Sequence, residues 1–103
     1  MELLKEEYFQ SLVLKARQTY GDEGQIDQFH EEIGELMVAV SHYKRGRIQK
    51  EEVLKEIADV EQLIMTLVIM LGLTPEEYEE VQLKALNDFA VNVKEKPRNY
   101  PKH

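Results

Sequence analysis

Two acidic pairs with the same spacing are the residues of this sequence best suited to chemistry. Glu32 and Glu35 lie in the segment FHEEIGELMVAV. Glu56 and Asp59 lie in the segment KEIADV. An i, i+3 spacing places both carboxylates of a pair on one side of a helix. Carboxylate oxygens are the ligands that a hard divalent cation such as Mg²⁺ takes in proteins, so the two pairs form a candidate metal site.

Apolar residues at helical spacing border both acidic pairs. They are Phe29, Ile33, Leu36 and Val40 around the first pair, and Val53, Ile57, Val60 and Ile64 around the second. Like charges on one helix repel each other, and carboxylates beside a hydrophobic core are costly. A bound cation would turn this unfavourable arrangement into a favourable one. The alternative is that the acids are solvated surface charges, which is the usual role of a single pair with this spacing.

Glycine and proline divide the chain into segments that we predict to be helical. The predicted helices cover residues 2–20, 25–45, 50–71 and 75–93, and no segment shows the alternation of a strand. Gly46 and Gly72 are predicted helix stops, and Thr74 with Glu77 is a predicted capping box. We therefore expect an all-α four-helix bundle in one domain, residues 1–93, followed by an extended tail, residues 94–103.

The predicted hairpin of residues 25–71 would bring the two acidic pairs together. A short loop around Gly46 makes its two helices antiparallel neighbours. Each acidic pair lies about a dozen residues from Gly46, which at about 1.5 Å of rise per residue puts both pairs at nearly the same height. Four carboxylates on facing helices would then converge, and we interpret them as a metal cage.

The order of these motifs resembles a known family. EEIGEL followed by EEVLKEIADVEQLI is similar to the signature of the MazG-like all-α nucleoside triphosphate pyrophosphohydrolases, EExxE and then ExxD after a variable spacer. The similarity covers about residues 20–90. It implies four-helix protomers that form a homodimer or a homotetramer (a dimer of dimers). It also implies use of Mg²⁺, with Mn²⁺ as a possible substitute, to split a nucleoside triphosphate substrate into a monophosphate and pyrophosphate.

The resemblance also assigns roles to individual residues. The metal ligands would be Glu32, Glu35, Glu56 and Asp59, and the catalytic residues Glu31 and Glu32, with Glu31 in an outer shell or orienting the attacking water. Lys84 and Asn87 in KALND resemble residues that contact phosphate, and Gln28, with Gln25, resembles residues that face the nucleobase. A basic residue found after the Asn in relatives is missing here, where Asp88 and Ala90 occupy the region. Lys94 or Arg98 are possible substitutes.

Composition excludes several classes of function. The 103 residues carry a net charge of −7 and no cysteine. Disulfides, thiolate zinc sites and cysteine nucleophiles are therefore excluded, and binding to a nucleic-acid polymer is not expected without a basic patch. The most apolar run, LIMTLVIMLGL, is shorter than the roughly 20 residues that a membrane span needs. With no signal-peptide pattern at the N-terminus, we expect a cytoplasmic protein without membrane contacts.

Two other interpretations of the sequence compete with the hydrolase. A di-iron bundle uses Glu-x-x-His pairs, and this sequence contains none. A non-enzymatic helical dimerisation or interaction module would explain the helices without any metal. Because LIMTLVIMLGL is apolar on nearly every side, we predict that it contributes to an interface between subunits.

Overall fold

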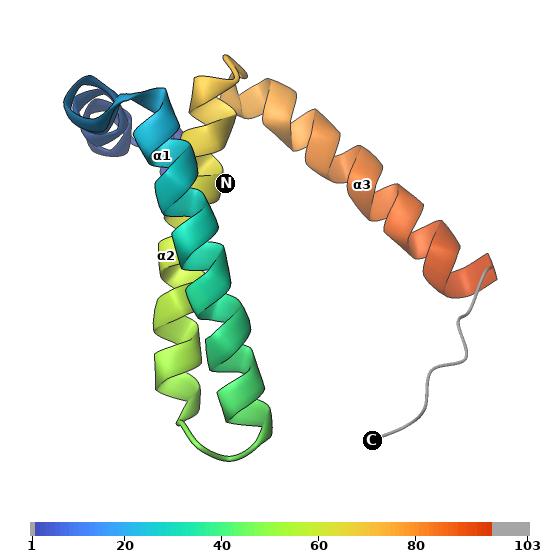
Figure 1. The fold of residues 1–103 in the computed structure, drawn as a ribbon. Coiled ribbons are helices and arrows are strands. Elements are labelled where there is room, and N and C mark those ends of the chain that lie inside the picture. The colour runs from blue at the N-terminus through green and yellow to red at the C-terminus, as the bar shows by residue number, and fades with distance from the viewer. Residues whose placement is uncertain (1, 96–103) are drawn as a thin grey trace. The chain divides into compact units, whose positions relative to one another are not determined.

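The computed structural model describes residues 2–95, and these residues are helical without any strand (Figure 1). The elements are a short 3₁₀ helix η1 (Glu2–Lys5) and the α-helices α1 (Glu7–Lys44), α2 (Lys50–Met70) and α3 (Pro75–Glu95). The predicted all-α class is confirmed. The chain divides into a first unit that ends at Leu73 and a second unit that begins at Thr74. Between residues 2 and 95, no single helix is both long and apolar enough to cross a membrane.

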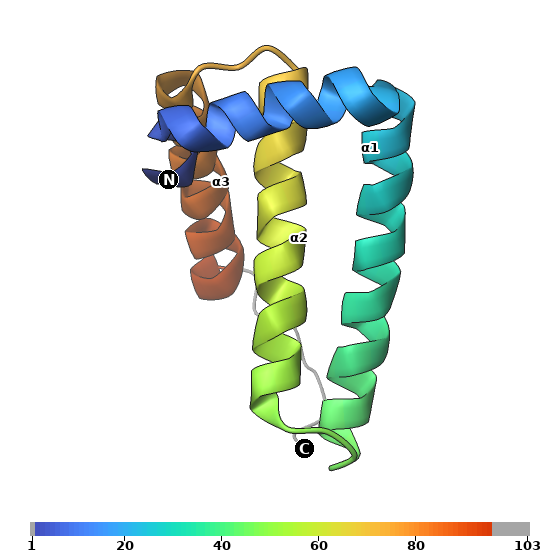
Figure 2. The ribbon, with the colours of Figure 1, turned by 90° about the vertical axis from the view of Figure 1, so that its left-hand side faces the viewer.

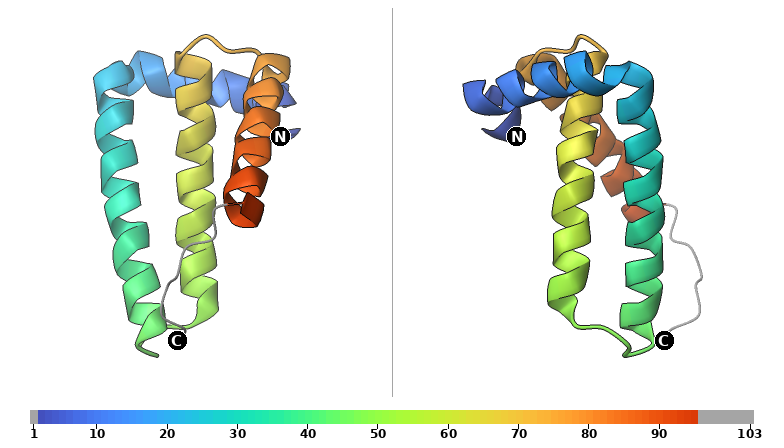
Figure 3. Two further views of the ribbon diagram at one scale, coloured as in Figure 1. Left: turned by 90° about the vertical axis from the view of Figure 1, so that its right-hand side faces the viewer. Right: turned by 60° about the vertical axis from the view of Figure 1, so that its left-hand side comes forward.

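The first unit is built on an antiparallel hairpin of α1 and α2. The later part of α1 runs beside α2, and a short loop connects them (Figures 1 and 3). Gly46 in this loop has a φ of 73°, so the predicted left-handed helix stop is confirmed. At the start of α2, the backbone N–H of Gln49 donates to Glu52 Oε2 at 3.1 Å in a capping box. Both ends of the loop are thus fixed by local interactions.

A single glycine separates the two parts of α1. The predicted break between two helical segments is confirmed, but it is narrower than the predicted turn over residues 20–24, because only Gly21 leaves the helical conformation, at φ 74° and ψ 165°. Residues 22–24 are already helical again. Arg17 closes the break by donating from Nε and Nη2 to both carboxylate oxygens of Asp22, at 2.8 and 3.0 Å. With the two parts of α1 counted as one element, the structure has three α-helices among residues 2–95, where four were predicted.

The core of the first unit lies where the early part of α1 crosses the C-terminal half of α2. Figure 2 shows this early part lying across the end of α2. The most buried apolar side chains are Leu4, Val13 and Met65, which are 2–3% exposed. Most of the run LIMTLVIMLGL is buried or half-buried here, and Leu71 is its most exposed member at 77%. Much of that run is therefore buried within the first unit itself, without contact with a second subunit.

The second unit is described from Thr74 to Glu95 and consists of α3. The predicted capping box is confirmed, because the backbone N–H of Glu77 donates to Thr74 Oγ1 and that of Thr74 donates to Glu77 Oε1, both at 3.1 Å. None of the residues of α3 is buried. Lys94 and Glu95 still belong to the helix, so the predicted tail starts too early. The rest of the predicted tail, residues 96–103, lies outside the described residues.

We predict that Gly21→Ala destabilises the protein by about 1–3 kcal/mol, since the φ and ψ of this residue are accessible almost only to glycine. No heavy atom lies within 4 Å of the added Cβ, so the loss would come from the backbone alone. Urea unfolding followed by circular dichroism measures the change.

Gly34→Ala is the matched control, because Gly34 lies within regular helix and its added Cβ also meets no atom within 4 Å. This variant should gain about 0.5–1 kcal/mol, as alanine is the better helix former. Equal effects of the two substitutions would show that Gly21 is not a required break.

Candidate metal centre

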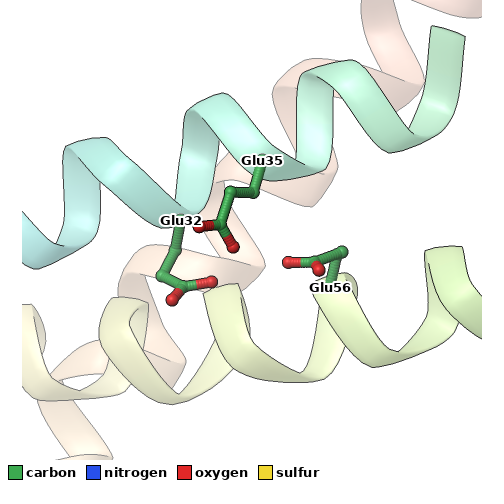
Figure 4. A group of neighbouring side chains, drawn as sticks. All are labelled: Glu32, Glu35 and Glu56. Carbon is green, nitrogen blue, oxygen red and sulfur yellow. The ribbon is translucent and has the colours of Figure 1, made fainter.

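Three acidic side chains meet between the arms of the hairpin (Figure 4). Glu32 and Glu35 come from α1 and Glu56 comes from α2, and each offers a carboxylate oxygen within 4.8 Å of the others. We call these three residues the acid cluster. Its members are separated by 24 residues at most in the sequence, and the hairpin alone brings them together. The predicted convergence of acids from facing helices is therefore present for three of the four residues.

Two oxygens of the acid cluster are buried without a hydrogen-bond partner. They are Oε2 of Glu32 and Oε2 of Glu56, one on each arm of the hairpin. A buried acceptor that lacks a donor loses its hydration without compensation. An oxygen-seeking cation placed between the arms would satisfy both atoms and reduce the repulsion among the carboxylates. The donor set is therefore of the type that suits Mg²⁺ or Mn²⁺.

The electrostatics of the acid cluster are most visible at Glu35. Its pKa is raised above the ordinary value of 4.5, first by the charge of Glu32, then by burial and then by the charge of Glu56. A hydrogen bond with Glu32 and the charge of Glu31 act in the same direction. Glu35 thus retains a proton to higher pH than an isolated glutamate, because a proton relieves the repulsion that a cation would otherwise relieve.

Asp59, the fourth predicted ligand, is engaged elsewhere in this structure. Its Oδ2 accepts a hydrogen bond from Lys55 Nζ at 3.0 Å, and the two form an i, i+4 ion pair on α2. Asp59 is therefore not one of the three carboxylates that converge. The side chain of Lys55 is 73% exposed and that of Asp59 33% exposed, so the ion pair is accessible to solvent.

A groove beside the acid cluster gives it an open side. The groove has a volume of about 610 Å³ and is lined by Glu31, Gly34, Glu35, Val38, Ala39, His42, Ile48, Glu52 and Glu56. Two of these positions are glycine and alanine, which leaves room between the arms. Glu31, one of the two predicted catalytic acids, is exposed and lines the groove together with Glu35 and Glu56. A ligand in this groove would contact carboxylates from both helices.

The remaining predicted site residues fall into two groups. Gln28 is close to the acid cluster, because its Nε2 donates to Glu32 Oε1 at 2.9 Å. Lys84 and Asn87 occupy exposed positions on α3, in the second unit. Lys94, named as a substitute phosphate ligand, also lies on α3, whereas Arg98 lies outside the described residues. The centre described above consists of first-unit residues alone.

Sequence reasoning missed two contacts that hold acids of the motif. Lys55 binds Asp59, and Gln28 binds Glu32, one of the predicted metal ligands. Both contacts have an i, i+4 spacing on a single helix, which is a signal that the sequence contains. His42 and Glu52 were likewise not expected to line the groove.

Comparison with known proteins identifies no relative: no protein-family model, curated protein or solved structure matches this chain. The centre is therefore characterised by its own geometry.

We predict that Glu35→Gln raises the melting temperature of the metal-free protein at pH 7. The raised pKa of Glu35 means that its ionised form costs stability above that pKa, and the cost is lost as the pH falls toward and below 4.5. The stabilisation by the variant should shrink over the same range. Thermal melts from pH 7 to pH 4 with a chelator present measure it.

Glu23→Gln is the control for this experiment, since Glu23 is an exposed acid on the same helix. It should shift the melting temperature little and show no such pH dependence. A stabilisation by Glu35→Gln that stayed constant down to pH 4 would contradict the assignment of the repulsion to Glu35.

Proposed function

We propose that the protein is a Mg²⁺-dependent nucleotide pyrophosphohydrolase that splits nucleoside or deoxynucleoside triphosphates into a monophosphate and pyrophosphate. The observation that carries the proposal is that two oxygens of the acid cluster are buried without a hydrogen-bond partner. They are Oε2 of Glu32 on α1 and Oε2 of Glu56 on α2. The resemblance to MazG-like enzymes supports it, because the converging residues are those that the motif names.

The acid cluster would hold the cation, with oxygens of Glu32, Glu35 and Glu56 as the protein ligands and Asp59 as a fourth. A bound Mg²⁺ would supply charge neutralisation for the phosphates and lower the pKa of a water molecule. The groove beside the cluster would hold the triphosphate chain. Since the protein is acidic overall, the cation is what makes the binding of a polyanion favourable.

Glu31 is suited to handle the proton of the attacking water. Its exposed carboxylate lines the groove next to Glu35. In the proposed reaction, the water oxygen forms a bond to phosphorus, its proton passes to a carboxylate such as Glu31, and the bond to the departing pyrophosphate breaks. Lys84 and Asn87 would bind the phosphates and Gln28 would lie near the base, as the resemblance implies.

The exposed apolar surface favours association of the protomer with further copies. Large apolar side chains remain exposed on both arms of the hairpin, namely Met37, Val38, Val40, Tyr43, Leu54 and Ile57. Exposed apolar residues also occur on α3, among them Val81, Leu83, Leu86 and Phe89. Such surfaces are typical of proteins that bury them against other helices. The same observation favours the second candidate function, a helical interaction module without catalysis.

We predict that the protein sediments as a dimer or tetramer at micromolar concentration, because association with further copies would bury apolar side chains that each unit exposes. Analytical ultracentrifugation over a range of concentrations measures the mass. A monomer of 12.1 kDa at every concentration would contradict the proposed association.

We predict that Glu56→Gln lowers the rate of pyrophosphate release by about a hundredfold or more, since a hard cation loses a charged ligand. The metal-free variant should nevertheless melt at a higher temperature than the parent, because one charge leaves a repulsive cluster. Pyrophosphate release from a panel of triphosphates with Mg²⁺ gives the rate, and calorimetry gives the melting temperature.

Glu61→Gln is the control, as Glu61 is an exposed acid on the same helix outside the acid cluster. It should change neither quantity. Full turnover by Glu56→Gln at saturating Mg²⁺ would reject the metal role. A parent protein that releases no pyrophosphate and whose melting is unaffected by Mg²⁺ would favour the interaction module.

A further inference from the structure

The ammonium group of Lys55 contacts Asp59, the predicted metal ligand that is not part of the acid cluster. Lys55 Nζ lies 3.0 Å from Asp59 Oδ2, and Lys55 immediately precedes Glu56 in the chain. The pKa of Lys55 is raised by its hydrogen bond to Asp59 and by the charges of Asp59, Glu56 and Glu32. Its positive charge therefore acts on Asp59 and on carboxylates of both hairpin arms.

We propose that Lys55 is a built-in counter-ion that holds Asp59 outside the acid cluster in the metal-free protein and gives it up when a divalent cation binds. Lys55 is thus a positioning residue, because it acts on the metal site through Asp59. The proposal rests on the proposed function only in requiring that the acid cluster binds a divalent cation.

The position of Asp59 on α2 makes such an exchange possible. Asp59 lies three residues after Glu56, which places the two carboxylates on neighbouring turns on one side of the helix. The partner Lys55 is on the same helix, so the ion pair can break by side-chain rotation without moving the backbone. An i, i+4 pair of this kind, with a lysine that is largely exposed, is held only weakly. A doubly charged ion is a stronger competitor for the carboxylate than one ammonium group.

Lys55 and the cation would thus compete for the same negative charge. Without metal, Lys55 offsets part of the repulsion among the acids and stabilises the hairpin. With metal bound, the same positive charge repels the ion. Removal of the charge should therefore have opposite effects on the two states, whereas a lysine with a purely solvated role should affect neither.

The test compares Mn²⁺ binding by the parent, Lys55→Gln and Lys15→Gln, measured by calorimetric titration and by loss of the free-ion paramagnetic resonance signal. Lys15 is an exposed lysine in the middle of the early part of α1, on the other side of the Gly21 break from the acid cluster. We expect Lys55→Gln to bind Mn²⁺ about three- to tenfold more tightly than the parent. In the presence of chelator, it should also melt at a lower temperature than Lys15→Gln.

The outcomes separate this proposal from the proposed function. If the parent does not bind Mn²⁺, both the metal site and the exchange are wrong. If the parent binds Mn²⁺ and Lys55→Gln binds it with equal or lower affinity, only the role of Lys55 is overturned. Pyrophosphate release is not needed for either conclusion, so a parent that binds metal without hydrolysing nucleotides leaves the test of Lys55 intact.

A second readout follows the ammonium group itself. In nitrogen-15 spectra selective for lysine side chains, Mg²⁺ should move the Lys55 signal to the position it has in Asp59→Asn, where the ion pair is absent. The Lys15 signal should stay in place. A Lys55 signal that keeps its metal-free position at saturating Mg²⁺ would show that the pair persists and would overturn the exchange.

Discussion

The candidate metal centre depends on the repulsion between carboxylates that the two arms of the hairpin hold at a similar distance from the loop. The four predicted metal ligands meet this constraint in different ways. Glu32 accepts a hydrogen bond from Gln28, and Glu35 has a raised pKa that favours its protonated form. Asp59 pairs with Lys55. Glu56 keeps a buried oxygen without any partner, as does Glu32. These interactions compensate only part of the negative charge, so a cation at the site would still be favourable.

The first unit has a buried apolar core at one end of the hairpin and a groove between the two arms nearer the loop. Leu4, Val13 and Met65 form the core where the early part of α1 crosses α2. Nearer the loop, Gly34 and Ala39 line a groove in place of larger residues. The hairpin is therefore anchored by apolar contacts away from the acids. Such an arrangement allows the arms to carry an unfavourable charge cluster, because its cost is offset elsewhere in the same unit.

Local signals made part of this structure predictable from the sequence. Gly46 ends a helix because it adopts a positive φ, and the Thr74–Glu77 capping box begins one because it satisfies backbone N–H groups. Both are found as expected. The convergence of Glu32, Glu35 and Glu56 follows from equal distances to one short loop. These features depend on residues that are near in sequence, where the physical options are few.

Other features could not be predicted because competing options differ little in energy. YGDEG reads as a turn between two helices, yet one glycine suffices for the break once Arg17 bridges to Asp22. Asp59 has the spacing to join Glu56 and the spacing to pair with Lys55, and the sequence does not rank the two. The arrangement of four helical segments as a bundle depends on long-range packing, which periodicity does not determine.

The short loop between α1 and α2 has a consequence for how the chain folds. Because the members of the acid cluster lie at most 24 residues apart in sequence, from Glu32 to Glu56, the loop that brings them together closes at little entropic cost. If the hairpin closes before the rest of the first unit packs, the charge repulsion acts in the folding transition state. Neutralising these side chains would accelerate folding more than it slows unfolding. The acid cluster would then affect the rate of folding as well as the stability of the folded protein.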